Sequence, residues 1–260
     1  MENKNVLAVS NLSVSYKKKV HVLNNISFEI ERGEILGLVG ESGCGKSTLA
    51  KAILGMIKHE SGEIRYNALS QGKGICPQMV FQDPYGSLNP VKKVGWILEE
   101  PLKLKGGFTK TQRRGRVSRM LDKVGLDSVF ADRYPSQLSG GQRQRVALAG
   151  ALMLEPELLI ADEPVSALDV TIQAQIIELL LKLHKDMNLS VLFISHDLRV
   201  VYQICDRVMI MRKGEIVETG NVQDIYFTPK HEYTRTLLDA AGIERTIEAC
   251  QEKAPLLRLE

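Results

Sequence analysis

The first third of the chain alternates short apolar, β-branched stretches with polar turns. Residues 7–16 and 20–30 show this pattern, with partial alternation of apolar and polar positions. Such alternation is typical of strands with one buried face, and the three lysines at 17–19 predict the turn between them. The chain is therefore expected to begin with a β-rich segment.

A compact apolar run over 34–39 leads directly into glycines, which predicts a buried strand that ends in a tight loop. The pattern becomes helical from 47 to 57, and Gly55 is expected to end this helix. A turn is predicted at 61–62, where a serine precedes a glycine, and another short apolar run ends at 80–81. A strand, a loop and a helix thus follow each other without a break.

Helical patterns replace strand patterns between residues 83 and 153. Three helices are predicted in this segment, over 94–105, 109–124 and 141–154. Thr109 followed by Gln112 is the pattern of a capping box, so the second helix is expected to begin there. The segment is predicted to be a helical subdomain.

Strand patterns return after this segment and alternate with helices. Strands are predicted at 158–161 and 191–194, on either side of an amphipathic helix over 171–187. A hairpin over 208–217 is expected to turn at Lys213-Gly214, and a helix is expected after Pro229. Strands that alternate with helices predict a mostly parallel sheet covered on both faces, and therefore an α/β fold.

Composition limits the classes of function. The chain has 260 residues and a formal net charge of +3 from well-interspersed groups, too mild a balance to indicate nucleic-acid binding. Its four cysteines lie far apart without C-x-x-C spacing, which argues against zinc and favours reduced thiols. The N-terminus is polar, and no apolar run approaches the ~20 residues that span a bilayer. Any action at a membrane is expected from its surface.

The strongest chemical signal is a phosphate-binding loop directly between the strand at 34–39 and the helix that follows it. Its residues fit the pattern G-x-x-x-x-G-K-[ST] and comprise Gly40, Glu41, Ser42, Gly43, Cys44, Gly45, Lys46, Ser47 and Thr48. Glycines let backbone amides turn inward, and the helix N-terminus adds unpaired N–H groups. Lys46 is expected to contact the β- and γ-phosphates of a nucleotide, and Ser47 to ligate Mg²⁺.

Two adjacent carboxylates end a second apolar strand. Asp162 and Glu163 follow the run 158–161, and repulsion between them favours a nearby cation. In phosphate-loop ATPases an aspartate at such a strand end holds Mg²⁺. We therefore expect Asp162 to serve the metal, and Glu163 to orient the attacking water or accept its proton.

A second glycine pair opens a helix of the helical subdomain. Ser139, Gly140, Gly141 and Gln142 follow Leu138, and Ser139 is a natural N-cap. The paired glycines expose backbone amides where the helix dipole is positive, so this loop is predicted to be a second anion site.

In this combination the chain resembles the ATP-binding cassette (ABC) family over about residues 5–240, since further motifs of that family follow in order. By resemblance, Tyr16 stacks on adenine, and Gln82 is the Q-loop glutamine that joins the Mg²⁺ site. Residues 139–142 match the signature loop, and His196 matches the switch histidine that contacts the γ-phosphate. The D-loop that crosses the dimer interface corresponds to Ser166, Ala167, Leu168 and Asp169.

The resemblance implies a phosphate-loop NTPase (RecA-like) core with a mostly parallel sheet, an N-terminal antiparallel β-subdomain and an inserted helical subdomain. The predicted nucleotide-binding domain spans 5–242, and a short tail spans 243–260. Its core lobe comprises 5–82 and 155–228, and its helical subdomain 83–154. Mg²⁺ is expected at Ser47, Gln82 and Asp162, and catalysis at Glu163, His196 and Gln82.

The family also implies partners. Two cassettes pack head to tail, so that each ATP lies between the phosphate loop of one chain and the signature loop of the other. The partner cassette is expected to be a paralogue or a second copy. Transmembrane permease subunits, and indirectly an external substrate-binding protein, complete the assembly, which places the chain peripherally on the cytoplasmic face of the membrane.

Two stretches, 80–90 and 229–234, resemble the dipeptide, oligopeptide and nickel importer branch. Glu232, Gly150 and Val165 depart from residues common in that branch, and none of these changes alters the phosphate chemistry. Some members carry a C-terminal cysteine cluster, but this chain has Cys250 alone there, so no iron–sulfur cluster is expected. The resemblance implies an ATP-hydrolysing subunit that powers uptake of peptides or of nickel and other metal chelates.

Five alternatives are less consistent with the sequence. A cassette ATPase of DNA maintenance would carry long heptad repeats between Lys46 and Asp162, and a translation-factor cassette would carry two cassettes, whereas this chain shows neither. A phosphate-loop GTPase would show the guanine-reading N-K-x-D motif, which does not occur, and a kinase would leave the signature loop unexplained. A binding module without turnover would not need Glu163 and His196.

Overall fold

The structure is a computed structural model that describes residues 4–16, 20–67 and 74–243. The chain divides into two compact units, one formed by residues 1–73 and 190–260 and the other by residues 74–189. Among the described residues, no helix combines the length and the apolar character that crossing a membrane requires. The domain boundaries predicted from the sequence stay a prediction.

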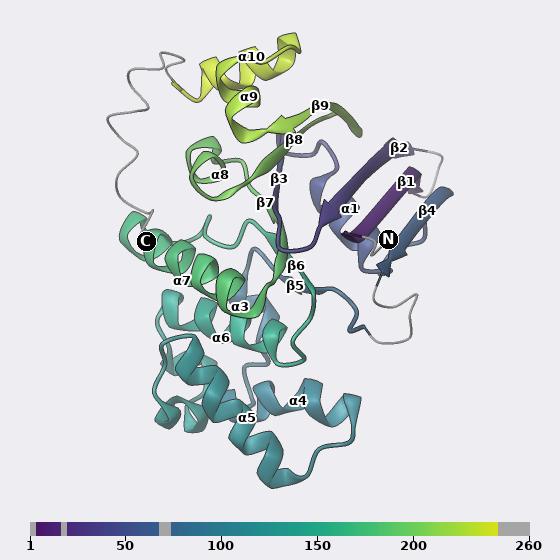
Figure 1. Ribbon diagram of the computed structural model, residues 1–260. Helices are drawn as coiled ribbons and strands as arrows, with labels where there is room; N and C mark the ends of the chain where they lie inside the picture. Colours follow the sequence, from purple (N-terminus) through teal and green to yellow (C-terminus); the bar gives the residue numbers. More distant parts are fainter. Residues whose placement is uncertain (1–3, 17–19, 68–73, 244–260) are drawn as a thin grey trace. The chain divides into compact units, whose positions relative to one another are not determined.

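The first unit contains two sheets, which Figure 1 shows with their labels. Its strands are β1 (Asn5–Tyr16), β2 (Val20–Glu31), β3 (Ile35–Val39), β4 (Ser61–Tyr66), β7 (Ser190–Ile194), β8 (Arg207–Arg212) and β9 (Glu215–Asn221). Strands β2, β1 and β4 form an antiparallel sheet. Strand β3 lies between β7 and β8 and is parallel to both, while β9 pairs antiparallel with β8. The antiparallel hairpin and the parallel strands are those that the pattern predicts.

The helices of this unit are α1 (Lys46–Ile53), α8 (Leu198–Ile204), α9 (Val222–Phe227) and α10 (Glu232–Ala240). Strands β3 and β7 are buried along their whole length, since helices and loops cover both faces of a parallel sheet. This explains why both read as continuous apolar runs rather than as alternating patterns.

The predicted turn at Ser61-Gly62 is wrong, since these residues begin strand β4. Gly62 has a φ of +93°, and a Cβ at this position would lie 2.5 Å from the Asn11 carbonyl oxygen of β1. The register of β1 against β4 shifts between Ser10 and Ser13 at the same place. The glycine therefore marks a close approach of two irregular strands, which a local pattern does not distinguish from a turn.

The second unit is mostly helical. It contains β5 (Gln78–Val80), β6 (Leu158–Asp162), α3 (Pro84–Ser87), α4 (Val94–Lys105), α5 (Lys110–Lys123), α6 (Gly140–Leu152) and α7 (Val170–Met187), with short 3₁₀ turns at Ser128–Asp132 and Pro135–Gln137. Strands β5 and β6 are parallel neighbours. The three predicted helices of the segment 83–153 and the long helix before β7 are confirmed, whereas α3, α8 and α9 were too short for their periodicity to predict.

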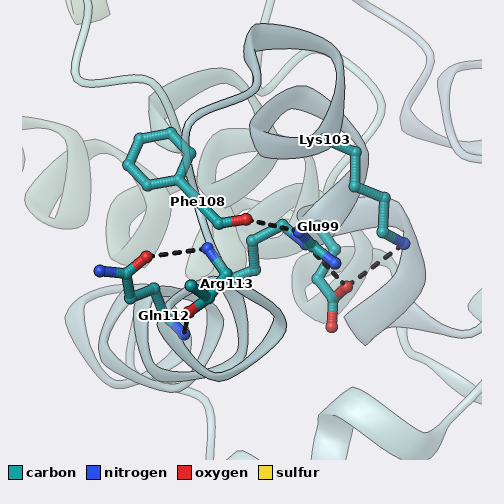
Figure 2. Close-up of polar contacts among 6 residues, drawn as sticks. Glu99, Lys103, Phe108, Gln112 and Arg113 are labelled. Carbon is teal, nitrogen blue, oxygen red and sulfur yellow. Dashed lines mark hydrogen bonds and ion pairs between the residues drawn. The ribbon is translucent and has the colours of Figure 1, made fainter.

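Polar contacts join α4 to the loop and the helix that follow it (Figure 2). The predicted capping box is present, since Gln112 N donates to the Thr109 hydroxyl and Thr109 N donates to the Gln112 side chain. Glu99 forms ion pairs with Lys103 at 3.2 Å and with Arg113 at 3.5 Å, and Arg113 also donates to the Phe108 carbonyl. These contacts fix where α5 begins relative to α4.

Candidate functional site

The phosphate loop follows β3 directly and ends where α1 begins, at Lys46. Gly43 and Gly45 have φ values of +81° and +115°, which a residue with a Cβ adopts only with strain. Among the described residues, no side chain caps the first turn of α1, so its amides remain available to an anion. The loop has the geometry that the sequence predicts for binding a phosphate group.

Lys46 is the cation of this loop. Its side chain is only 6% exposed, and its ammonium donates to the Gly40 carbonyl at 2.8 Å and to the Glu41 carbonyl at 3.0 Å. Two neutral carbonyl acceptors compensate part of the desolvation of this buried side chain, and a bound phosphate would supply the opposite charge. The ammonium is therefore held inside the loop, at a position set by two of the loop's own carbonyls.

The hairpin β8–β9 packs against the phosphate loop. A Cβ on Gly40 would lie 2.2 Å from the Met211 carbonyl oxygen, so only glycine allows this approach. Gly214 in the hairpin turn donates its backbone N–H to the Cys44 carbonyl at 2.9 Å, and its φ is +83°. The predicted hairpin is thus confirmed, and its turn also contacts the phosphate loop through the main chain.

Burial is expected to lower the reactivity of Cys44 and Cys205. Both side chains are buried, whereas Cys76 is exposed. Burial raises the pKa of the Cys44 thiol, partly offset by the nearby Lys46 charge, and raises the pKa of the Cys205 thiol well above its ordinary value. A raised thiol pKa leaves less of the reactive thiolate at any given pH.

We therefore expect iodoacetamide at pH 8 to modify Cys76 at least about tenfold faster than Cys44 or Cys205 in the folded protein. Quantitative mass spectrometry of the separate peptides measures the labelling rate of each cysteine. It also distinguishes these three from Cys250, which lies outside the described residues. Denaturation in urea should make the rates similar. Equal labelling of Cys44 and Cys76 in the folded protein would contradict the burial of the loop cysteine.

His196 lies at the same sheet edge as the phosphate loop. Strands β3 and β7 are parallel neighbours with Leu38 opposite Ile194, and Ser195 N donates to the Leu38 carbonyl at 3.3 Å. The carboxyl ends of adjacent parallel strands meet at one edge, so the segments after them share that edge. The structure brings the exposed His196 to the edge where the loop begins.

In the second unit, the acidic pair is joined to Gln82. Asp162 is the last residue of β6 and is 7% exposed, while Glu163 adopts a φ of +48° in the turn after it. Gln82 Nε2 donates to the Glu163 carboxylate at 2.8 Å and lies 3.5 Å from the Ser166 hydroxyl. Ser166 in turn donates to the Glu163 carbonyl at 3.1 Å.

A left-handed backbone at a glutamate costs about 1 kcal/mol or more, and it persists where the surroundings impose it. The Ser166 hydroxyl donates to the Glu163 carbonyl, and Gln82 Nε2 donates to the Glu163 carboxylate. These two hydrogen bonds hold the main chain and the side chain of Glu163 in this conformation. The structure thus brings together three residues that the sequence predicted as parts of separate motifs. A pairing of Gln82 with Glu163 was not predicted.

The signature loop opens α6 as predicted. Ser139 accepts from Gln142 N at 3.3 Å, and Gln142 accepts from Ser139 N at 3.0 Å, which makes a reciprocal capping box. Gly141 is buried, and a Cβ there would lie 2.6 Å from the Ile172 side chain of α7. The glycine is therefore also required for the packing of α6 on α7.

The D-loop segment runs from Ser166 to Asp169, and Asp169 caps α7 by accepting from Ile172 N at 3.0 Å. Ala167 and Asp169 are exposed, and Val170 is 81% exposed.

The remaining predicted residues divide between the units. Ser47 belongs to the first unit, and Gln82 and Asp162 belong to the second, so the predicted Mg²⁺ ligands come from both. They supply oxygen atoms, which is the donor type that Mg²⁺ prefers, and so they fit this ion. The side chain of Tyr16 lies outside the described residues, and its contact with adenine stays a prediction. Sequence reasoning missed Met211, Gly214 and Tyr233 as neighbours of the phosphate loop.

Comparisons with known proteins identify the family of this chain. The model of the family described as ABC transporter matches residues 23–166. The dipeptide transport ATP-binding protein DppF of Escherichia coli K12 is 48% identical in an alignment of 237 positions that covers 86% of this chain and 70% of the relative. The glutathione import ATP-binding protein GsiA of Pectobacterium atrosepticum is 44% identical in an alignment of 257 positions that covers 92% of this chain and 41% of that longer protein.

Solved structures agree on the fold. CbiO1 of Clostridium perfringens, described as part of the ABC transporter complex CbiONQ, has a TM-score of 0.77 at 27% identity and covers 97% of both chains. The ATP-binding cassette MJ0796, solved as a dimer bound to ADP and phosphate, has a TM-score of 0.72 at 30% identity and covers 83% of this chain and 98% of that one. The predicted fold class and family are confirmed: the chain belongs to the ABC transporter family, whose ATP-binding subunits hydrolyse ATP to power transport.

Proposed function

We propose that this chain is the ATP-hydrolysing subunit of a peptide importer, driving uptake through a separate membrane permease. The observation that carries the proposal is the built phosphate loop, with the buried Lys46 ammonium and uncapped α1 amides, in a chain 48% identical to a dipeptide transport ATP-binding protein. Relatives named for peptide and glutathione import favour peptides over nickel or other metal chelates as the cargo. Their names also disfavour a role in DNA maintenance or translation.

In this proposal the phosphate loop holds the nucleotide. The amides from Gly43 to Thr48 and the Lys46 ammonium would bind the phosphates, and the Ser47 hydroxyl, Gln82 and Asp162 would hold Mg²⁺. The ion would supply positive charge against the phosphates, which favours attack by water. Positioning and charge neutralisation are the main contributions of the protein, since phosphoryl transfer needs little covalent chemistry.

Glu163 is the residue proposed to orient the attacking water and accept its proton. Its carboxylate accepts from Gln82 Nε2 at 2.8 Å, which orients this side chain in the turn after β6. His196, at the sheet edge of the loop, is proposed to contact the γ-phosphate. Gln82 would then contact both Mg²⁺ and Glu163. Because Gln82 lies in the predicted Q-loop, a movement of this loop on the permease would change the position of both groups and couple transport to hydrolysis.

A second cassette is proposed to complete the site. The capping box of Ser139 leaves the first amides of α6 beside Gly140, which suits the phosphates of a nucleotide held by the other subunit. The exposed segment around Ala167 and Val170 would lie in the contact between subunits. The partner is a paralogue or a second copy, and the assembly sits on the cytoplasmic face of the membrane.

Co-expression with a candidate permease tests the importer role. The tagged permease is expected to retain this chain in detergent, and the complex in liposomes is expected to hydrolyse ATP faster when a peptide-loaded binding protein is added. Permease-free membranes are the control and should retain none. A chain that never co-purifies with any peptide permease, or whose ATPase activity ignores peptide, would contradict the importer role and leave the ATPase role standing.

A further inference from the structure

A tyrosine near the end of the described chain contacts the phosphate loop. Tyr233 lies in the first turn of α10, and its hydroxyl accepts a long hydrogen bond of 3.4 Å from the backbone N–H of Glu41, 192 positions earlier. The tyrosine is 6% exposed, and the Arg212 guanidinium lies over its ring at 4.7 Å from the centroid. The tyrosine side chain is thus buried, while its hydrogen bond to Glu41 is part-buried.

The position of Tyr233 is set by the start of α10. His231 caps the helix by accepting from Tyr233 N at 3.0 Å. Glu218 of β9 accepts from Lys230 N at 2.8 Å and from His231 N at 3.1 Å. Three backbone amides around this helix start are therefore fixed by side chains, which leaves the tyrosine little freedom to move away from the loop.

The hydroxyl stays neutral at physiological pH. Burial raises the pKa of Tyr233, and the neighbouring Glu41 carboxylate adds to the rise, whereas the backbone N–H of Glu41 opposes it. A neutral phenol can accept from the N–H and still donate its own proton.

Glu41 connects this contact to the cation of the loop. Its N–H is held by Tyr233, while its carbonyl accepts from the Lys46 ammonium at 3.0 Å. The two groups are on the same residue, so a shift of the Glu41 main chain moves the acceptor of Lys46. The side chain of Tyr233 thus acts on the position of the ammonium through one residue.

We propose that Tyr233 is a positioning residue for nucleotide binding, which braces the phosphate loop at Glu41 and thereby sets where the Lys46 ammonium meets the phosphates. Helix α10 is then part of the nucleotide site rather than an appendage to the cassette. The inference rests on the proposed function in so far as the loop binds ATP. It concerns affinity and not the chemical step, because Tyr233 contacts the loop rather than the residues proposed to act on water.

The substitution Tyr233→Phe tests this, since it removes the hydroxyl and keeps the ring beneath Arg212. We expect KM for ATP, and the Kd for ADP measured by calorimetry, to rise about 3- to 10-fold, the effect of one net hydrogen bond. The value of kcat at saturating Mg-ATP should stay within about twofold of that of the unmodified protein.

Tyr202→Phe is the matched control. The Tyr202 hydroxyl also accepts a hydrogen bond of 3.4 Å, from Gln223 Nε2. Tyr202 lies in the same unit, on helix α8, which contributes no residue to the proposed site. It should leave KM and Kd unchanged while altering thermal stability to a similar degree. Unchanged affinity in Tyr233→Phe, or an equal loss in Tyr202→Phe, would overturn the proposal.

Glu41→Gln separates the two possible contacts of the hydroxyl. In that background the backbone N–H remains, so Tyr233→Phe should still weaken ADP binding by the same factor. Loss of the effect would show that the carboxylate, and not the main chain, carries the contact, and would overturn the route through Lys46. If the unmodified protein binds no ATP at all, the proposed function fails instead, which is a distinguishable result.

Discussion

Glu163→Gln is expected to lower kcat for ATP hydrolysis by about 100-fold or more while ATP still binds. A glutamine cannot accept a proton, and a positioned general base contributes typically 10²- to 10⁴-fold. The shape is nearly unchanged, and the amide oxygen can still accept from Gln82, which donates at 2.8 Å to the natural carboxylate. Steady-state phosphate release measures kcat, and gel filtration with Mg-ATP should show an accumulated dimer, because closure is no longer followed by hydrolysis.

The chain offers a matched control for this substitution. Glu155 belongs to the same unit, has a similar left-handed φ of +53°, and lies 3.8 Å from Arg116, outside the predicted site. Glu155→Gln should leave kcat within about twofold of its normal value. Hydrolysis by Glu163→Gln at the rate of the unmodified protein would show that Glu163 is not the base.

The second large effect is expected from Lys46→Ala, which should weaken Mg-ATP binding by about 100-fold or more and leave no measurable turnover. The substitution removes a charge-assisted contact to the phosphates, in a buried place where water replaces it poorly. It also leaves the carbonyls of Gly40 and Glu41 without the donor that now bridges them. Isothermal titration calorimetry with Mg-ATP measures the loss.

Lys51→Ala serves as the control, since Lys51 is an exposed residue of the same helix α1. It removes the same charge about one turn and a half further along, so binding should be unchanged. Thermal unfolding of both variants shows whether the loop substitution disturbs the fold. Normal Mg-ATP affinity in Lys46→Ala would refute the role of the ammonium.

The features that the sequence predicted well are local ones. The phosphate loop is contiguous, so its glycines, its lysine and the helix behind them appear together in the chain from Gly40 to Thr48. The predicted capping box at Thr109 and the predicted N-cap at Ser139 each involve residues three positions apart, and both are present. Helices α4 to α7 are long enough for their periodicity to be counted.

The errors and omissions have two physical causes. At Gly62 a glycine beside a serine looks like a turn, but the approach of β1 makes it part of a strand. Helices α8 and α9 span seven and six residues, too few for a helical period to stand out. The first error was decided by a contact with a distant segment, and the two helices were missed because they are short.

The amino-acid sequence by itself determined the motif chemistry, the order of the elements and the family, because these depend on residue types at short, set spacings. The tertiary structure alone decided which distant residues meet. Gln82 reaches Glu163 across 81 positions, and Tyr233 reaches Glu41 across 192. A hydrogen bond depends on the distance and the angle between donor and acceptor. When the two partners lie on different elements, the sequence pattern specifies neither quantity.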